Sequence, residues 1–140
     1  MGKILCAIRG GEEGYRTQDA AVALALERGD ELVFLVVLET SILSQAFGAG
    51  GCDMRGTLTR MGHSILFNAV ERARHLGVEP RGVLREGNPR EQIPAAALEE
   101  KATTVILGRP QGRYDKFSLA GLESFADEIA NATGAEVDIL

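Results

Sequence analysis

Short runs of apolar residues alternate along the chain with longer segments in which apolar residues recur every three or four positions. Apolar runs without polar alternation are typical of strands that are covered on both faces of a sheet. Glycine or proline follows or interrupts several of these runs, as expected where strands end or lie at an edge. The pattern predicts strands at residues 3–8, 31–38, 78–86, 103–107 and 137–140.

The segments between these runs have the periodicity of amphipathic helices. Asn88 and Pro89 form a helix start, because asparagine caps free N–H groups and proline suits the first helical position. The predicted helices cover residues 15–28, 58–76, 89–101 and 117–131. In the second helix, the residues expected to share the buried face are Leu58, Met61, Ile65, Leu66, Ala69, Ala73 and Leu76.

Strands that alternate with helices in this way predict an α/β fold with right-handed crossovers. We expect residues 1–140 to form a single doubly wound domain, a five-stranded parallel sheet in the order 3-2-1-4-5 with four flanking helices. In this order the switch point, where ligands bind beyond the carboxyl ends of the strands, lies between the first and fourth strands. Arg9, Gly108 and Arg109 are therefore expected to face one crevice.

The segment 40–56 separates the second predicted strand from the second predicted helix. It contains four glycines together with small polar residues, which have weak structural preferences. We interpret it as a mobile loop, with a lid over the crevice as the alternative. It lacks the Lys-Ser/Thr ending of a phosphate-binding P-loop.

The composition excludes several classes of protein. With 45% hydrophobic and 25% charged residues, the chain has the make-up of a globular domain, and no signal-peptide pattern or membrane span is evident. We therefore expect a cytoplasmic protein that makes no membrane contact. A formal net charge of −5 argues against binding to nucleic acid, since polyanions are attracted by dense basic surfaces.

No arrangement of side chains indicates catalysis or a metal site. Cys6 and Cys52 lack the spacing of zinc ligands and are interpreted as reduced thiols. His63 and His75 lie twelve positions apart on one predicted helix, where exposed histidines are common. The serines lack both a G-x-S-x-G elbow and a partnering base. The sequence therefore predicts a binding protein, with no catalytic and no metal-binding residues.

The clearest indication of a ligand follows the fourth predicted strand. Its apolar run stops at Gly108 and opens into the polar segment Arg109-Pro110-Gln111-Gly112. Beyond the carboxyl end of a parallel strand, unpaired backbone N–H groups point outward and attract phosphates. The loop therefore predicts a small-molecule site.

Four blocks of the chain, in their order, resemble the universal stress protein family, within the larger group of adenine-nucleotide-binding α hydrolase-like domains. The blocks are residues 3–8, 31–37, 86–93 and 105–108. The resemblance implies pairing of two copies through the last strand, Val137–Leu140. The physical argument agrees, because an exposed apolar edge strand is normally paired or protected.

The family's ATP-binding members carry the motif G-x-x-G, nine residues, then G followed by Ser or Thr. Gly108 and Gly121 lie thirteen positions apart, which is the spacing of the first and third glycines. Gln111 replaces the middle glycine, and Gly112 comes one residue late. Leu122 replaces the hydroxyl residue. Because these changes place side chains where backbone N–H groups would meet phosphate, the ATP site is predicted to be degenerate.

The resemblance also assigns residues to the adenosine side of the site. Val37 matches a residue whose backbone borders adenine, and Arg9, which precedes Gly10, stands where the family has an aspartate that looks toward the adenosine. Arg9 and Arg109 favour an altered pocket that takes ATP, AMP or another phosphate-containing anion. The alternative is that the arginines are surface charges, either solvated or paired with Glu12, Glu13 or Asp115.

We therefore predict a homodimeric stress-response module with a binding or regulatory function and a degenerate nucleotide site. Its candidate ligand-binding residues are Arg9, Gly10, Val37, Gly108, Arg109, Gln111, Gly112, Gly121 and Leu122. Two alternatives stay open. One is an ATP-binding switch or weak ATPase with a rearranged loop. The other is an interaction module that binds an unknown protein partner and no small ligand.

Overall fold

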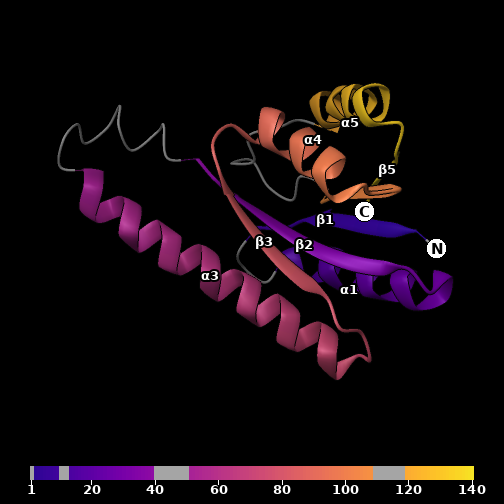
Figure 1. Ribbon diagram of the computed structural model, residues 1–140, viewed down its shortest axis with the longest axis horizontal. Helices are drawn as coiled ribbons and strands as arrows, with labels where there is room; N and C mark the ends of the chain where they lie inside the picture. The colour runs from indigo at the N-terminus through magenta and orange to yellow at the C-terminus, as the bar shows by residue number, and fades with distance from the viewer. Residues whose placement is uncertain (1, 10–12, 40–50, 109–118) are drawn as a thin grey trace.

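A computed structural model describes residues 2–9, 13–39, 51–108 and 119–140, and within these ranges strands and helices alternate along the chain (Figure 1). The strands are β1 (Lys3–Ala7), β2 (Glu31–Leu38), β3 (Arg81–Glu86), β4 (Thr104–Leu107) and β5 (Glu136–Ile139). The helices are α1 (Glu13–Arg28), α3 (Gly51–His75), α4 (Pro89–Glu100) and α5 (Leu119–Thr133). The strands and helices expected from the hydrophobic pattern are all present.

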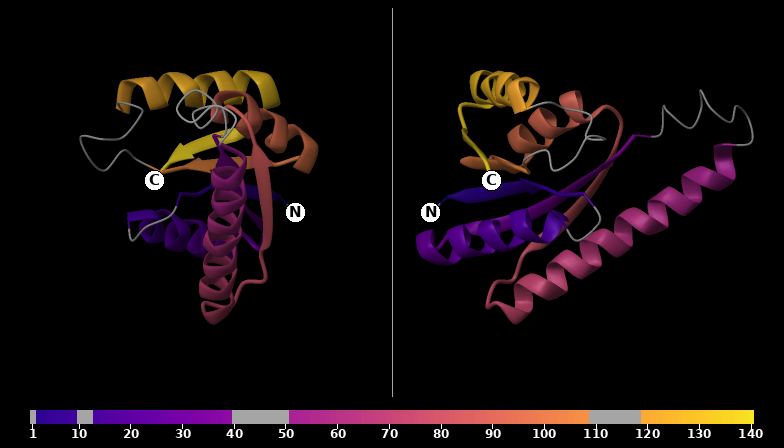
Figure 2. Two further views of the ribbon diagram at one scale, coloured as in Figure 1. Left: turned by 90° about the vertical axis from the view of Figure 1, so that its left-hand side faces the viewer. Right: turned by 180° about the vertical axis from the view of Figure 1, so that it is seen from behind.

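The strands form one parallel sheet in the order β3-β2-β1-β4-β5. β1 lies at its centre, where Cys6 pairs with Phe34 of β2 on one side and with Ile106 of β4 on the other. Figure 2 shows the layers edge-on, with α1 and α3 on one face and α4 and α5 on the other. The predicted fold class and strand order are confirmed.

Each face of the sheet carries its own hydrophobic core. Because side chains alternate along a strand, Ile4 and Cys6 of β1 pack toward α1 and α3, whereas Leu5 packs toward α4 and α5. Phe34 is the largest fully buried side chain of the first core, and Phe125 is that of the second. Burial on both faces explains why the central strands are apolar runs without polar alternation.

The start of α3 differs from the sequence prediction. The helix begins at Gly51, so residues 51–56, which were expected to belong to a mobile loop, are helical. Residues 40–50 lie outside the described residues, so neither the loop nor the lid is tested there. The glycines concealed the helix: each costs about 1 kcal/mol relative to alanine, a penalty that the remaining turns of this 25-residue helix outweigh.

The buried face of α3 is also narrower than predicted. Leu66, Ala69 and Ala73 are buried, as expected, but Met61 and Leu76 are 55% and 47% exposed. At the level of Met61 the helix meets the sheet through Gly62, where an added Cβ atom would lie 2.8 Å from the side chain of Leu84, so glycine and not methionine faces the sheet there. Leu76 lies beyond the last residue of α3, His75.

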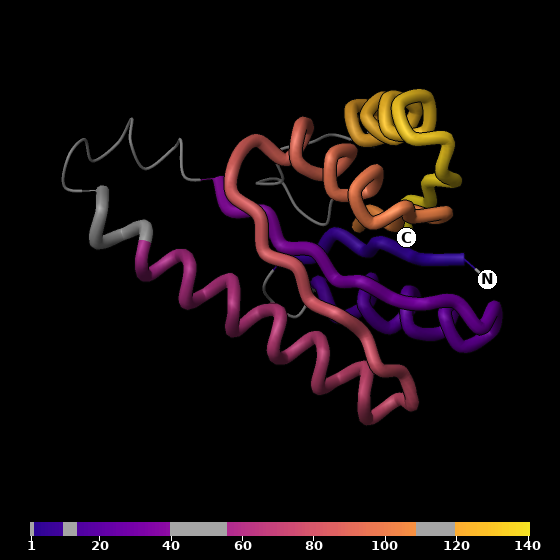
Figure 3. The backbone as a smooth tube through the Cα atoms, viewed as in Figure 1, coloured from indigo at the N-terminus to yellow at the C-terminus, as the bar shows by residue number. Residues whose placement is uncertain are grey.

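β3 begins at Arg81, directly after Pro80, and not at residue 78. Proline donates no ladder hydrogen bond and is therefore confined to strand starts and edges. β3 lies at one edge of the sheet beside β2, as predicted. Figure 3 shows the backbone running from the end of β3 directly into α4, which brings the start of α4 to the carboxyl edge of the sheet.

Lys101 closes α4 in a conformation that favours glycine. Its φ of 56° and ψ of 44° are left-handed, and its N–H donates to the carbonyls of Ala97 and Leu98. We expect Lys101→Gly to raise the free energy of unfolding by about 0.5–1 kcal/mol, because glycine adopts this conformation without a steric penalty. Urea denaturation measures the change. Lys101→Ala is the control, since it removes the same side chain but keeps the penalty; an equal gain in both variants would refute the backbone explanation.

Candidate functional site

A cavity of about 470 Å³ lies at the carboxyl ends of β1, β2 and β4. This is the predicted switch point: the crossovers on either side of β1 pass to opposite faces of the sheet and leave a gap between them. The strand ends line the cavity with Ile8 and Arg9 from β1, Val37 and Glu39 from β2, and Leu107 and Gly108 from β4. The segments that follow each strand are thus brought to one place.

The helices close the cavity with apolar side chains. Leu58 comes from α3, Pro89 and Ile93 come from α4, and Leu122 and Phe125 come from α5. Phe125 is only 2% exposed. A slot with apolar walls suits a planar, weakly polar group such as a nucleobase, because such a group loses little hydration when it is buried.

The start of α4 is held by local hydrogen bonds. The side chain of Asn88 accepts a 3.0 Å hydrogen bond from the N–H of Arg90, which confirms the predicted cap and places Pro89 at the first helical position. The N–H of Gly87 donates to the carbonyl of Leu38 at 2.9 Å. These bonds tie the turn before α4 to the end of β2 and thereby fix the wall that Pro89 provides.

The backbone of Val37 faces the cavity side of β2. The N–H of Ile8 donates to the carbonyl of Leu35 at 2.8 Å, which is the last ladder bond between β1 and β2 among the described residues. In a parallel strand, the N–H and C=O of every second residue point to the same side. Those of Val37 therefore point toward β1, one step beyond the last ladder bond between described residues, on the side where the cavity lies.

Packing from beneath the sheet accounts for glycine at position 108. A Cβ atom on Gly108 would lie 3.0 Å from Oγ1 of Thr17, a buried residue of α1. The Thr17 hydroxyl also lies 3.5 Å from the carbonyl oxygen of Leu140, whose own N–H donates to Leu107. The floor of the cavity at β4 is thus set by contacts with α1, independently of any ligand.

The charge on the described wall of the cavity is carried by two side chains. Arg9 is exposed and Glu39 is half-buried, and these are the only cation and the only acid among the described residues that line the cavity. Arginine presents a planar fork of donors that matches phosphate and carboxylate oxygens. The cavity therefore combines an apolar slot with one anion-binding side chain.

Of the candidate residues from the sequence, Arg9, Val37, Gly108 and Leu122 line the cavity. Gly121 is half-buried and precedes Leu122 in the first turn of α5, but it does not line the cavity. The remaining candidates lie outside the described residues; they are Gly10, Arg109, Gln111 and Gly112.

Sequence reasoning missed the helical walls, above all Pro89, Ile93 and Phe125. A signal for them was present. The cap at Asn88 marks a helix start, and in a parallel α/β sheet helix starts lie at the same edge as the carboxyl ends of the strands. Phe125 follows Leu122 by three positions, so it shares that residue's helix face.

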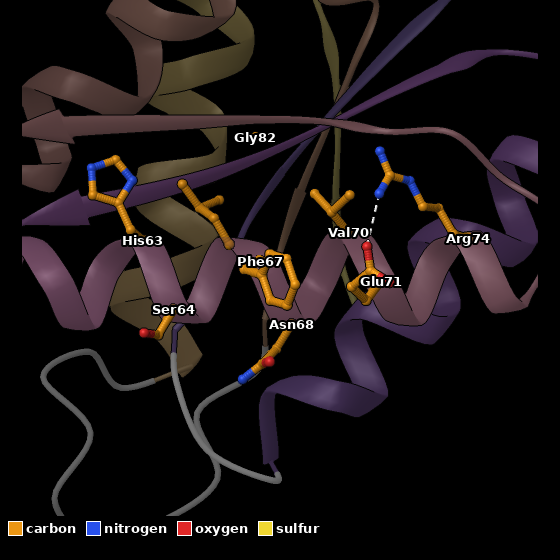
Figure 4. Close-up of a pocket in the computed structure, with 9 residues that line it drawn as sticks. His63, Ser64, Phe67, Asn68, Val70, Glu71, Arg74 and Gly82 are labelled. Carbon is orange, nitrogen blue, oxygen red and sulfur yellow. Dashed lines mark hydrogen bonds and ion pairs between the residues drawn. The ribbon is translucent and has the colours of Figure 1, made fainter.

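A second depression, of about 740 Å³, lies on the outer face of α3 (Figure 4). His63, Phe67 and Arg74 project from one stripe of the helix toward the edge strand β3, and Arg74 pairs with Glu71 at 2.7 Å. It is an open surface beside one helix and one strand. His63 and His75 are exposed, as predicted for histidines on a helix surface.

Neither the buried cysteine nor the metal-ligating residue types form a site in the described parts of the chain. Cys6 is a free cysteine in the core, and burial raises the pKa of its thiol to about 12, so the reactive thiolate does not form near neutral pH. Over the described parts of the chain, no group of histidine, cysteine and acidic side chains is arranged to hold a metal ion. None of the helices in those parts is long and apolar enough to cross a membrane.

Comparison with known proteins gives consistent matches. The family model described as "Universal stress protein family" matches residues 1–140. The universal stress protein YxiE of Bacillus subtilis is 29% identical over 114 residues, which cover 76% of this chain and 77% of that protein. A universal stress protein from Archaeoglobus fulgidus in complex with dAMP aligns with a TM-score of 0.67 and 19% identity, over 99% of this chain and 97% of that one. A universal stress protein in complex with cAMP aligns with the same TM-score and identity, over 99% and 95%.

Proposed function

The chain belongs to the universal stress protein family, and on that premise we propose that it is a homodimeric regulatory module of the stress response whose cavity binds an adenine nucleotide or a related phosphate-containing ligand. The observation that carries this proposal is the cavity at the carboxyl ends of β1, β2 and β4, with its apolar slot, its strand end at Val37 and its cation at Arg9. Two structural neighbours hold cAMP and dAMP.

The adenosine part of such a ligand fits the β2 end of the cavity. Leu58 and Pro89 supply apolar surface for the base. The backbone of Val37 supplies a donor and an acceptor side by side, which is the pattern that the edge of adenine complements. A base in this position is recognised by backbone groups, so its binding depends little on the identity of the side chain at position 37.

A triphosphate fits less well at the opposite end of the cavity, which is formed by the end of β4 and the start of α5. Gly108 and the first turn of α5 offer backbone N–H groups at the positive end of a helix dipole. The side chain of Leu122 also lines that end and is 6% exposed, so it presents hydrocarbon where charged oxygens would lie. This supports a degenerate ATP site, with the base retained as the principal anchor.

The proposed dimer forms through β5. This strand lies at the edge of the sheet, beside β4, and its Val137 and Ile139 are only partly buried. Leu140, directly after it, is 39% exposed. Pairing of two copies would cover this edge and the adjoining apolar side chains. Because Leu140 is hydrogen-bonded to Leu107, a wall residue of the cavity, the dimer edge and the ligand site share one strand end.

Native mass spectrometry of the freshly purified protein, followed by thermal-shift titration, tests the proposal. We expect the mass of a dimer, and a rise in melting temperature with adenine nucleotides. At a ligand concentration one hundred times the Kd, the stabilisation is about 2.7 kcal/mol, which corresponds to roughly 5–10 °C for a domain of this size.

Each other outcome points to a different function. ATP that copurifies in stoichiometric amount, or that stabilises the protein more than every other nucleotide, would establish the ATP-binding switch or weak ATPase. A protein that responds to no nucleotide and no inorganic anion would be an interaction module that acts through a protein partner. A monomeric mass at micromolar concentration would exclude the dimer.

A further inference from the structure

Three residues of the cavity lie in a row across the carboxyl edge of the sheet. Val37 is the last but one residue of β2, Arg9 follows β1, and Gly108 follows β4. β1 lies between the other two strands. Ala7 pairs with Leu35, so Arg9, two residues on, is level with Val37. Neighbouring strands are about 4.8 Å apart, so the row spans about 10 Å with Arg9 at its middle.

The two ends of the row differ in chemistry. The β2 end provides apolar cover and the backbone donor and acceptor of Val37, which suit a base. It also carries Glu39, whose charge repels a phosphate there. The β4 end provides the first turn of α5, where the helix dipole favours the 5′-phosphate although Leu122 limits its approach. A nucleotide bound in this direction places its ribose over β1, beside Arg9.

An arginine beside a ribose favours a sugar that carries a negatively charged group over one with only neutral hydroxyls. Neutral ribose hydroxyls are met best by a carboxylate, which accepts their protons, whereas a guanidinium only donates. In dinucleotide-binding folds an acid beside the ribose hydrogen-bonds a free 2′-hydroxyl, and an arginine nearby accommodates a phosphate on that oxygen. Arg9 is the only cation among the described residues that line the cavity, so on this described wall the positive charge lies at the level of the sugar.

We propose that this cavity selects adenine nucleotides that carry a phosphate on a secondary ribose oxygen, O2′ or O3′, and that Arg9 is the residue that determines this specificity. The inference rests on the proposed function, because it requires that a nucleotide binds with its base at the β2 end. The preferred ligand then has its phosphate against the guanidinium of Arg9, and the Leu122 end of the cavity holds at most the uncharged 5′-hydroxyl.

Isothermal titration calorimetry with the three isomers of adenosine monophosphate tests the inference. The 2′-, 3′- and 5′-phosphates have the same base and the same charge and differ only in where the phosphate is attached. We expect at least one of the 2′- and 3′-isomers to bind roughly tenfold to hundredfold more tightly than the 5′-isomer, the range expected for charge-assisted hydrogen bonds. In Arg9→Ala we expect the three affinities to agree within about twofold, because the hydrogen bonds from the guanidinium are lost.

The control variant is Arg16→Ala, which removes another exposed arginine, from α1 and not among the residues that line the cavity. It changes the net charge by the same amount. It should keep the preference. If adenosine and all three isomers fail to bind, the proposed function fails. If they bind but the 5′-isomer binds as tightly as the others, or if Arg9→Ala keeps the preference, the proposed function stands and the assignment of Arg9 is wrong.

Discussion

Replacing Phe125 by alanine is expected to lower the free energy of unfolding by about 3–4 kcal/mol and, in the same protein, to weaken nucleotide binding. The ring is 2% exposed and belongs to the core between the sheet and α5, so its removal leaves a void among packed side chains. It also lines the cavity, and the Arg90 guanidinium lies 6.0 Å from its ring centre. The void therefore opens into the cavity and removes a wall of the ligand slot.

Phe34→Ala separates the two effects. Phe34 is fully buried, but it packs in the opposite core, toward α1 and α3, and does not line the cavity. We expect the same loss of stability from urea denaturation, with nucleotide affinity changed by less than about twofold once the folded fraction is accounted for. Equal losses of affinity in both variants would show that binding follows global stability and not the wall that Phe125 provides. Phe125→Leu and Phe34→Leu give a milder pair if the alanine variants do not fold.

The fold was predictable because its signals are local and redundant. β2 reads as a strand at every position from Leu32 to Leu38, since both of its faces are buried, and its bounds match the prediction. The cap at Asn88 and the proline after it specify the start of α4 from two residues alone. The alternation of elements and the handedness of crossovers then limit the strand order to a few arrangements, of which 3-2-1-4-5 is a familiar one. The start of α3 was missed because its glycines carry no local signal for a helix.

The site was predictable only in part, because a binding surface depends on which elements the fold brings together. Arg9 and Gly108 were found from their positions after strands and Val37 from the family resemblance, and all three line one cavity. The glycine spacing suggested phosphate binding, yet the contact with Thr17 also favours glycine at position 108, because a Cβ atom there would lie 3.0 Å from the Thr17 hydroxyl oxygen. Packing and ligand binding can thus favour the same residue, so the residue pattern does not decide which ligand the cavity takes.

The close contact between Gly14 and Arg9 predicts a second large loss of stability on substitution. Gly14 lies in the first turn of α1, and a Cβ atom there would lie 2.6 Å from the carbonyl oxygen of Arg9. Because this oxygen belongs to the backbone, it moves only if the end of β1 or the start of α1 moves. We expect Gly14→Ala to lower the free energy of unfolding by about 1–3 kcal/mol and to displace Arg9 from its place at the cavity.

Gly56→Ala is the matched control, because it makes the same substitution in a helix where there is room. Among the described residues, a Cβ atom on Gly56 would meet only Nη1 of Arg60, at 3.8 Å, so we expect the gain in helix propensity to raise stability by about 0.5–1 kcal/mol. Both alanines share that gain, and urea denaturation of the two variants therefore isolates the contact with Arg9 as their difference. If Gly14→Ala is as stable as Gly56→Ala, then α1 does not press on the end of β1. If Gly14→Ala is destabilised but binds nucleotide with unchanged affinity, the position of Arg9 does not govern the cavity.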